Sequence, residues 1–251
     1  LLDEVARAAG HEYCRLGGLS LTPDHSHLAG STDTDGSERF TIHVKEIESG
    51  ELLADTIEGS SGSITWAADG QSFFYTVLSA EHRPYKVMLH KLGTDAEADT
   101  LIYEEEDPSF FVHVGKTSSR RFVCIMAGDH VSSEVQLIPA DAPLTPPLLV
   151  AARQAGHEYH LYDSDDEFLI RTNDTHRNFR IVTAPLGDPA REKWQEFIPA
   201  SDEHYITGLS TFKDFFVVEE RIQGQEQIRI RSYEGDEHYI EFPEASFTAG
   251  L

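Results

Sequence analysis

A short unit that recurs along the whole chain places the strongest constraint on its fold. In each copy a polar turn leads into an apolar run rich in aromatic and β-branched residues, too short for a typical helix. The turns are anchored at positions 24, 69, 118, 165 and 214, so successive copies are 45, 49, 47 and 49 residues apart. Short strands that repeat in groups of four at about this period are typical of the blades of a β-propeller.

The clearest copy covers residues 63–104. Its four apolar runs lie at residues 64–66, 73–78, 85–92 and 101–103, and the polar turn Asp69-Gly70 separates the first two. We therefore predict an all-β chain built from four-stranded antiparallel blades.

The domain organisation follows from the positions of the repeats. We predict a short helical lead-in over residues 1–10 and propeller over residues 11–251. The blades are predicted at residues 13–57, 63–104, 110–150, 159–198 and 206–242. Five large apolar residues are expected to pack the blades against one another: Trp66, Phe74, Phe122, Phe168 and Phe216. An open row of blades leaves apolar flanks uncovered, so either the five blades close on themselves or, as we favour, they are an arc of a larger ring. Such an arc is expected to pair with a second copy through those flanks or to distort so that its ends approach each other.

Composition narrows the class of partner. The chain has 20 Lys and Arg against 44 Asp and Glu, a net charge of −24, which disfavours nucleic acid and anionic membranes and suits cationic ligands. No apolar run approaches the roughly 18 residues of a membrane span. The two cysteines, Cys14 and Cys124, form no disulfide framework, and Cys124 is expected in the core. We expect a cytoplasmic protein and, since the first residue is not Met, a piece of a longer chain.

The sequence contains no recognisable active site. It lacks a G-x-S-x-G elbow, a P-loop and a dinucleotide fingerprint. His157 and His160 would point to opposite faces of a strand, and residues 33–38 are predicted to be a turn rather than a calcium loop. The carboxylate run at residues 163–167 is expected to be a uniformly solvated turn. We therefore predict no catalytic residue, metal or cofactor within this chain.

Histidines and arginines recur in the connections between the second and third strands of four predicted blades. In a propeller these connections share one face, which would form a docking or substrate surface; polar connections without a function are an equally good interpretation. The candidate residues for this surface are His82, Arg83, His130, His176, Arg177 and Arg221.

Several segments resemble the propeller domain of the prolyl oligopeptidase family of serine peptidases, in particular its oligopeptidase B (protease II) branch. The similarity extends over the whole chain and is carried by these segments: Glu12-Tyr13-Cys14-Arg15-Leu16-Gly17-Gly18, Asp33-Thr34-Asp35-Gly36-Ser37-Glu38-Arg39-Phe40, Arg83-Pro84-Tyr85-Lys86-Val87, Leu92-Gly93-Thr94, residues 101–107, residues 117–122 and Ser133-Glu134-Val135.

The resemblance implies a seven-bladed propeller joined to an α/β-hydrolase domain that carries a Ser-Asp-His triad. About five of the seven blades would be present, and the hydrolase domain and its triad would lie outside this chain. The resemblance implies that the propeller covers the active site and restricts substrates to short peptides. It also implies that the enzyme cleaves after Arg or Lys. The partners implied are the protein's own hydrolase domain and short basic peptides.

Two other functions remain open at this stage. The chain could be a free-standing propeller that serves as a binding scaffold without enzymatic activity. It could also be a self-contained five-bladed hydrolase that uses carboxylates. A G-x-S-x-G motif encoded beyond Leu251 would favour the peptidase over both.

Overall fold

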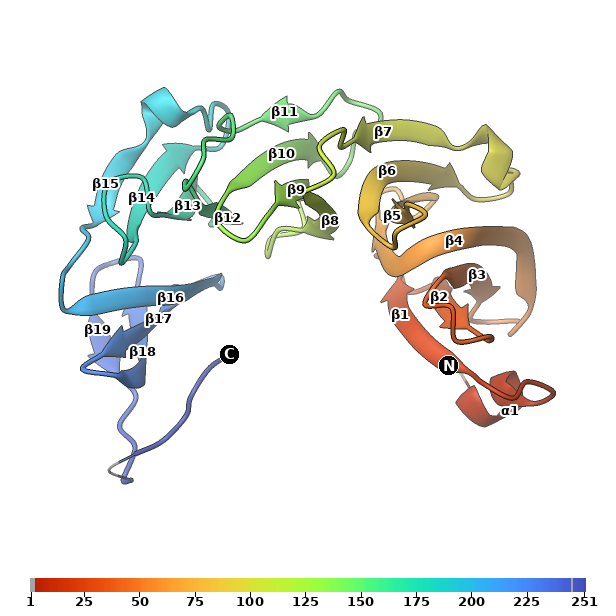
Figure 1. Ribbon diagram of the computed structural model, residues 1–251, viewed down its shortest axis with the longest axis horizontal. Helices are drawn as coiled ribbons and strands as arrows, with labels where there is room; N and C mark the ends of the chain where they lie inside the picture. Colours follow the sequence, from red (N-terminus) through yellow and green to blue (C-terminus); the bar gives the residue numbers. More distant parts are fainter. Residues whose placement is uncertain (1–2, 245) are drawn as a thin grey trace. The chain divides into compact units, whose positions relative to one another are not determined.

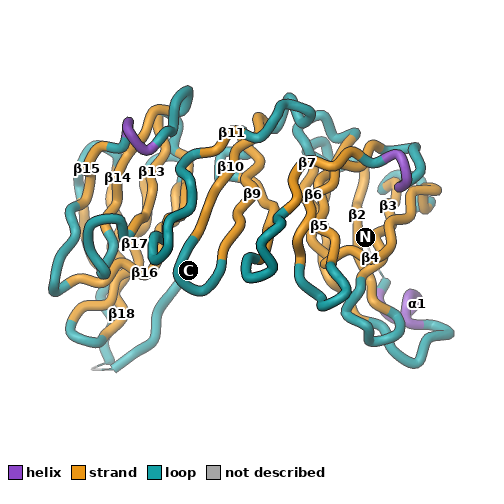
Figure 2. The backbone as a smooth tube through the Cα atoms, turned by 45° about the horizontal axis from the view of Figure 1, so that its top comes forward, coloured by secondary structure: helices purple, strands orange, loops and turns teal. Residues whose placement is uncertain are grey.

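The computed structural model describes residues 3–244 and 246–251, and strands dominate it (Figures 1 and 2). Helical structure is confined to α1 (Glu4–Ala8) and two 3₁₀ turns, η1 (Ala96–Ala98) and η2 (Arg191–Lys193). The helix begins where the Asp3 carboxylate accepts a hydrogen bond from the Ala6 amide at 3.0 Å, which is the usual way to satisfy a free N–H group at a helix start. The expectation of an all-β chain is confirmed.

The chain forms two compact units, which are described separately. The first comprises residues 1–116, 120–129 and 136–148, and the second comprises residues 117–119, 130–135 and 149–251. No helix in the described part of the chain is long and apolar enough to cross a membrane.

The first unit contains a seven-stranded antiparallel sheet whose strands are adjacent in chain order. These strands are β1 (Arg15–Leu21), β2 (His27–Asp33), β3 (Phe40–Glu46), β4 (Leu52–Trp66), β5 (Ser72–Leu78), β6 (Pro84–Lys91) and β7 (Thr100–Glu104). β4 pairs with β3 in its first half and with β5 in its second half, and Ser60 lies opposite a residue of each. Residues 52–57 and 63–66, assigned to different blades from sequence, therefore belong to one continuous strand.

Glycine makes this continuity possible. Gly59 and Gly62 have φ angles of +72° and +94°, in the region that favours glycine, so β4 can bend between its two partners. The space around Gly62 is also limited: a Cβ added there would lie 3.2 Å from the Phe40 ring and from Ser31 Oγ. The Ser31 hydroxyl donates a hydrogen bond to the Gly62 carbonyl at 2.8 Å, which fixes the bend against β2.

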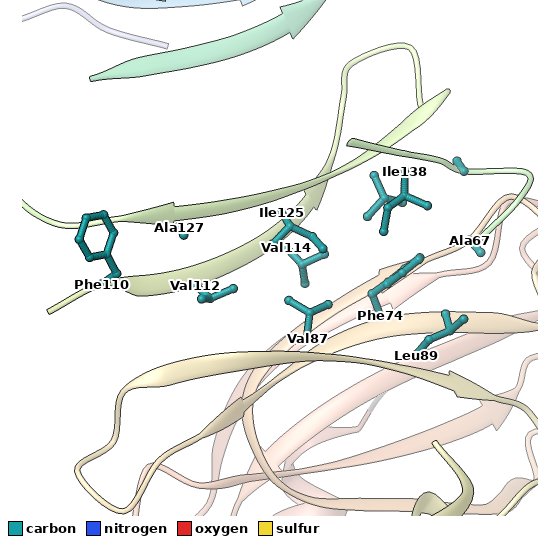
Figure 3. Close-up of a cluster of buried hydrophobic side chains, with 12 residues drawn as sticks. Ala67, Phe74, Val87, Leu89, Phe110, Val112, Val114, Ile125, Ala127 and Ile138 are labelled. Atoms are coloured by element: carbon teal, nitrogen blue, oxygen red, sulfur yellow. The ribbon is translucent and has the colours of Figure 1, made fainter. Parts of the chain in front are cut away.

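The next sheet has the order β11-β10-β9-β8. Its strands are β8 (Phe111–Lys116), β9 (Phe122–Gly128), β10 (Ser133–Pro139) and β11 (Leu148–Leu149). Within the first unit, Phe74, Val87 and Leu89 pack against apolar residues of β8, β9 and the end of β10 (Figure 3). These residues include Val112, Val114, Val123, Ile125, Ala127 and Ile138.

Two sequence predictions in β9 are wrong. Phe122 and Cys124 are only half-buried, whereas Val123, Ile125 and Ala127 face the core. Successive side chains of a strand point to opposite faces, so a shift of one position exchanges the buried and the half-buried sets. Trp66, Phe74, Phe168 and Phe216 are buried as predicted.

The second unit contains two further four-stranded antiparallel sheets in chain order. One comprises β12 (Tyr159–Asp163), β13 (Glu167–Thr172), β14 (Arg180–Pro185) and β15 (Gln195–Ile198). The other comprises β16 (His204–Thr211), β17 (Phe215–Ile222), β18 (Gln225–Ser232) and β19 (Glu237–Tyr239). Leu169 and Ile181 of the first of these sheets share an apolar core with Phe216 and Val218 of the second.

A buried cation also joins these two sheets. Arg171 on β13 donates from Nε to the Ile206 carbonyl at 2.9 Å, and its guanidinium lies 3.5 Å from the centroid of the Phe179 ring. The hydrogen bond and the ring face together compensate for removing a charge from water.

Candidate functional site

The structure distributes the six predicted surface residues over four places. His82 and Arg83 lie between β5 and β6, His130 lies between β9 and β10, and His176 and Arg177 lie between β13 and β14. Arg221 does not lie in a connection, because β17 extends to Ile222 and includes it.

Arg83 is a structural residue. Its guanidinium donates to the carbonyls of Phe110 at 2.8 Å, Asp107 at 3.2 Å and Glu105 at 3.3 Å, and it lies 5.4 Å from the centroid of the Tyr85 ring. These bonds hold the segment that leads from β7 into β8, so the guanidinium is committed to the protein itself.

The other five residues differ in whether their side chains are bonded. His176 interacts with Asp202 at 3.2 Å, and Arg221 pairs with Glu226 at 3.5 Å. Within the described residues, the side chains of His82, His130 and Arg177 are exposed and make no hydrogen bond or ion pair. None of the six is paired with a nucleophile in the described part of the chain, and their sharing of one face stays a prediction.

Another part of the repeat lines a cavity. It is the turn between the first and second strands of a blade, which we call the first turn. A cavity of about 550 Å³ in the second unit lies among three first turns; we call it the acidic cavity. It is lined by Ser118, Ser119, Asp163, Ser164, Asp165, Thr211, Phe212 and Lys213. The anchors at 118, 165 and 214 that revealed the repeat thus mark, within one residue, the walls of this cavity.

Asp163 organises the acidic cavity. Its side chain is buried, with 2% of the residue exposed, and it accepts hydrogen bonds from the Ser119 amide at 3.1 Å and from the Ser119 hydroxyl. Asp165 and Asp166, in contrast, are exposed. The expectation that residues 163–167 are uniformly solvated is therefore wrong, because the first carboxylate of the run bonds a neighbouring turn 44 residues away in sequence.

Two carboxylates, Asp163 and Asp165, and one cation, Lys213, line the acidic cavity. Burial, followed by the charges of Asp165 and Asp163, raises the pKa of Tyr233 to about 12. The hydroxyls of Thr211 and Ser118 are joined by a hydrogen bond of 3.1 Å. Hydroxyls and carboxylates of this kind suit the binding of a cationic group, and no histidine lines the cavity to act as a general base.

A histidine and two carboxylates meet elsewhere, but in a buried network. Nδ1 of His90 lies 2.7 Å from Asp99 Oδ1, and Nε2 lies 2.9 Å from Asp55 Oδ1. Tyr75 donates to Asp99 at 2.7 Å, and burial together with this bond raises the pKa of Tyr75. All members are buried or half-buried and bonded to one another, so the network cross-links β4, β5 and β6 instead of presenting a reactive group. Its sequence spacing matches no motif, so no local signal pointed to it.

One serine–histidine contact also has a structural explanation. Ser26 Oγ lies 2.8 Å from His27 Nδ1, but the same hydroxyl donates to Asp24 Oδ1 at 2.7 Å. Asp24 also accepts from the Ser26 amide at 3.0 Å, which is the pattern of an Asp-capped turn. Hydrogen bonds from Thr22 and Ser26 lower the pKa of Asp24. The proton of the Ser26 hydroxyl is thus used in a hydrogen bond within the first turn of the chain.

The residues considered as metal ligands are also accounted for. His157 is buried and lies 2.9 Å from Thr172 Oγ1 through Nε2, and burial lowers the pKa of both His157 and His160. Asp33 accepts hydrogen bonds from the amides of Asp35, Gly36 and Glu38, so residues 33–38 form a capped turn. In residues 3–244 and 246–251 no three His, Cys, Asp or Glu side chains cluster as metal ligands.

Comparisons with known proteins give a consistent result. The family model for the prolyl oligopeptidase N-terminal β-propeller domain matches residues 1–250. Dipeptidyl aminopeptidase BI of Pseudoxanthomonas mexicana is 36% identical over all of this chain and 35% of its own length. Protease 2 of Moraxella lacunata is 31% identical over all of this chain and 36% of its own length. The chain therefore spans about a third of these relatives.

Solved structures agree on the fold. Oligopeptidase B from Leishmania major superposes with a TM-score of 0.92 at 24% identity, over 98% of this chain and 36% of that one. Oligopeptidase B from Trypanosoma brucei superposes with a TM-score of 0.87 at 26% identity, over the same shares of the two chains. The sequence-based expectation of a β-propeller is confirmed.

Proposed function

Because this chain belongs to the family of prolyl oligopeptidase N-terminal β-propeller domains, we propose that it controls access to the active site of a serine peptidase that cleaves short peptides after Arg or Lys. The observation that carries the proposal is the family match over residues 1–250. Its relatives include proteins named as an aminopeptidase and a protease, each about three times as long as this chain.

In this proposal the chain binds and filters peptides, and a separate hydrolase domain of the same protein supplies the Ser-Asp-His triad. The absence of a G-x-S-x-G elbow from the chain supports this division of labour. Neither Cys14 nor Cys124 forms a disulfide in the described part of the chain, which suits the reducing cytoplasm where we place the protein.

The preference for basic peptides has two sources within the chain. The net charge of −24 raises the local concentration of cationic substrates. The acidic cavity adds a specific contact, since Asp165 is exposed at its wall and Asp163 contributes a second negative charge. We infer that a Lys or Arg side chain of the peptide lies in this cavity as the peptide passes.

The test uses the longer peptidase that we propose contains this chain. We expect it to cleave an arginyl or lysyl peptide amide but not a folded protein with the same residue in a loop. The Asp165→Asn variant should raise KM for the basic peptide about two- to fivefold, the range of an exposed ion pair. Asp166→Asn is the matched control, because Asp166 carries the same charge next to Asp165 and does not line the cavity.

Two results would contradict the proposal. Cleavage of the folded protein at the rate of the short peptide would exclude a size filter. Equal KM changes in Asp165→Asn and Asp166→Asn would leave only the overall charge, and no specific cavity, to explain the preference. A coding sequence without a G-x-S-x-G motif beyond Leu251 would favour the binding scaffold instead.

A further inference from the structure

The first unit contains a second cavity with the opposite character. Its volume is about 390 Å³, within the range of roughly 300–1,000 Å³ that is usual for small-ligand sites. It lies among the first turn of the chain, the end of β4 and the end of β8, and three of its lining residues are His25, Lys116 and Arg120. We call it the basic cavity.

The two strong cations of the basic cavity are not bonded to a carboxylate in the described part of the chain. Neither Lys116 nor Arg120 makes an ion pair or a side-chain hydrogen bond there. This is unexpected in a chain with 44 carboxylates and only 20 Lys and Arg.

One carboxylate, Asp69, acts electrostatically on Lys116 but is hydrogen-bonded within its own turn. Burial lowers the pKa of Lys116, the charge of Arg120 lowers it further, and Asp69 acts in the opposite direction. Asp69 does not line the cavity, and its oxygens accept hydrogen bonds from the Gln71 amide, the Ser72 amide and the Ser72 hydroxyl. A bound anion would relieve the repulsion between Lys116 and Arg120, which Asp69 does not neutralise.

Backbone conformation singles out the same residues. Arg120 and His25 have φ angles of +63° and +60°, in the left-handed region that costs free energy for residues with a side chain. The matching position of the intervening repeat is Gly70, with φ of +63°, which adopts this conformation without that cost. Residues with long side chains, His25 and Arg120, therefore stand at two turns of the cavity where glycine would be the less strained residue.

The remaining wall of the basic cavity is apolar and accessible. Leu19 and Leu21 alternate on β1 and are 48% and 38% exposed, and Ile64 lies beside them in the lining. The floor is rigid, because the buried Trp66 indole donates from Nε1 to the Ser20 carbonyl at 2.9 Å. The cavity thus combines a pair of cations with an apolar surface a few residues wide.

We propose that the basic cavity binds the C-terminal carboxylate of a short peptide. The carboxylate lies between Lys116 and Arg120, where the guanidinium can donate two parallel hydrogen bonds. The last side chain of the peptide packs on Leu19, Leu21 and Ile64. The choice of a peptide as ligand rests on the proposed function, whereas the anion site rests on the residues of the cavity alone.

The experiment uses the two tryptophans of the chain as reporters. The ¹⁵N-labelled protein is titrated with Gly-Gly-Leu as the free acid and as the C-terminal amide, and the indole N–H resonances are followed. We expect the free acid to shift the Trp66 resonance and to leave Trp194 in place, while the amide shifts neither. Trp194 lies in the second unit and serves as the internal control.

Variants then locate the site. Lys116→Gln and Arg120→Gln should each weaken binding of the free acid about tenfold or more, because each removes a charged hydrogen-bond donor. Arg120→Gly should lose binding equally while remaining folded, since glycine suits the positive φ angle. Arg177→Gln is the matched control, because it removes an exposed, unpaired cation outside the cavity and should leave the affinity unchanged.

Three outcomes would overturn the proposal. The first is equal binding of the free acid and the amide. The second is equal affinity in the parent, Arg120→Gly and Arg177→Gln proteins. The third is a Trp66 shift with inorganic phosphate and none with the peptide, which would leave a small-anion site in place of a peptide site. None of these measurements requires peptidase activity, so failure here is distinguishable from failure of the proposed access control.

Discussion

The acidic and basic cavities are built from the same structural part but carry opposite charge. Both lie among first turns, yet one is lined by Asp163 and Asp165 and the other by Lys116 and Arg120. Two strands that follow first turns differ too: Phe168 on β13 is completely buried, whereas Phe122 on β9 is half-buried. The comparison shows that the repeat determines where a cavity wall can form, while the few turn residues that face it determine which ligand it suits.

The largest expected difference concerns the two phenylalanines. Phe168→Ala should lower the free energy of unfolding by about 3–5 kcal/mol, because it empties an enclosed core position. Phe122→Ala should cost clearly less, since solvent and neighbouring side chains can fill its half-buried site. Chemical denaturation of both variants measures the difference. Equal losses of stability would show that Phe122 is as enclosed in the core as Phe168.

The buried carboxylate of the acidic cavity should have the next largest effect. Asp163→Ala removes the acceptor of two hydrogen bonds from Ser119, and leaving such donors unsatisfied costs about 1–3 kcal/mol. Asp165→Asn, an exposed change in the same run, should stay within about 0.5 kcal/mol of the parent. Thermal unfolding of the two variants side by side checks this. A larger loss of stability in Asp165→Asn than in Asp163→Ala would mean that Asp165, and not Asp163, is the structural carboxylate.

Tyr233, which interacts electrostatically with the carboxylates of the acidic cavity, and Lys116 of the basic cavity should respond oppositely to alkaline pH. The pKa of Tyr233 is raised from 10.0 to about 12, so between these values the unfolded chain loses a proton that the folded chain keeps, and this contribution to stability falls as pH rises. The pKa of Lys116 is lowered from 10.5, so as the pH rises toward 10.5 the folded chain loses this proton before the unfolded chain does. The contribution of Lys116 to stability therefore rises with pH.

Denaturation of the parent, Tyr233→Phe and Lys116→Gln proteins at a series of pH values from 8 upward tests both signs, with pH 10.0 and 10.5 as the ordinary pKa values of the two groups. The stability of Tyr233→Phe relative to the parent should increase above pH 10.0, and that of Lys116→Gln should decrease toward pH 10.5. The same trend in both variants would mean that burial does not disfavour the charged form of one of the two side chains.

The smallest expected effect concerns backbone conformation. Arg120→Gly should raise the free energy of unfolding by about 0.5–1 kcal/mol, because relief of the left-handed conformation exceeds the added entropy of the unfolded chain. Gly70→Ala should do the reverse by a similar amount, since its Cβ would have ordinary contacts of 3.7 Å and only the φ angle opposes it. A destabilised Arg120→Gly protein would mean that the arginine side chain stabilises its turn.

Much of the fold could be predicted because it depends on local patterns. The repeat period, the apolar runs and the Asp-containing turns are properties of neighbouring residues, and they correctly predicted an all-β propeller and the burial of Trp66, Phe74, Phe168 and Phe216. The candidate site could be predicted only in part. The turn positions were recognised as markers of the repeat, but the histidines and arginines singled out as a surface lie in other connections.

The sequence by itself determined the class of fold, the period of the blades and the family, because alternation along a strand and turn chemistry act over a few residues. The tertiary structure alone decided that Val123 rather than Phe122 faces the core, that β4 belongs to two neighbouring pairs of strands, and that Asp163 is buried against Ser119. It also brought His25 to the same cavity as Lys116 and Arg120. Burial and charge are set by groups that approach through space from tens of residues away, and no local pattern encodes which groups those will be.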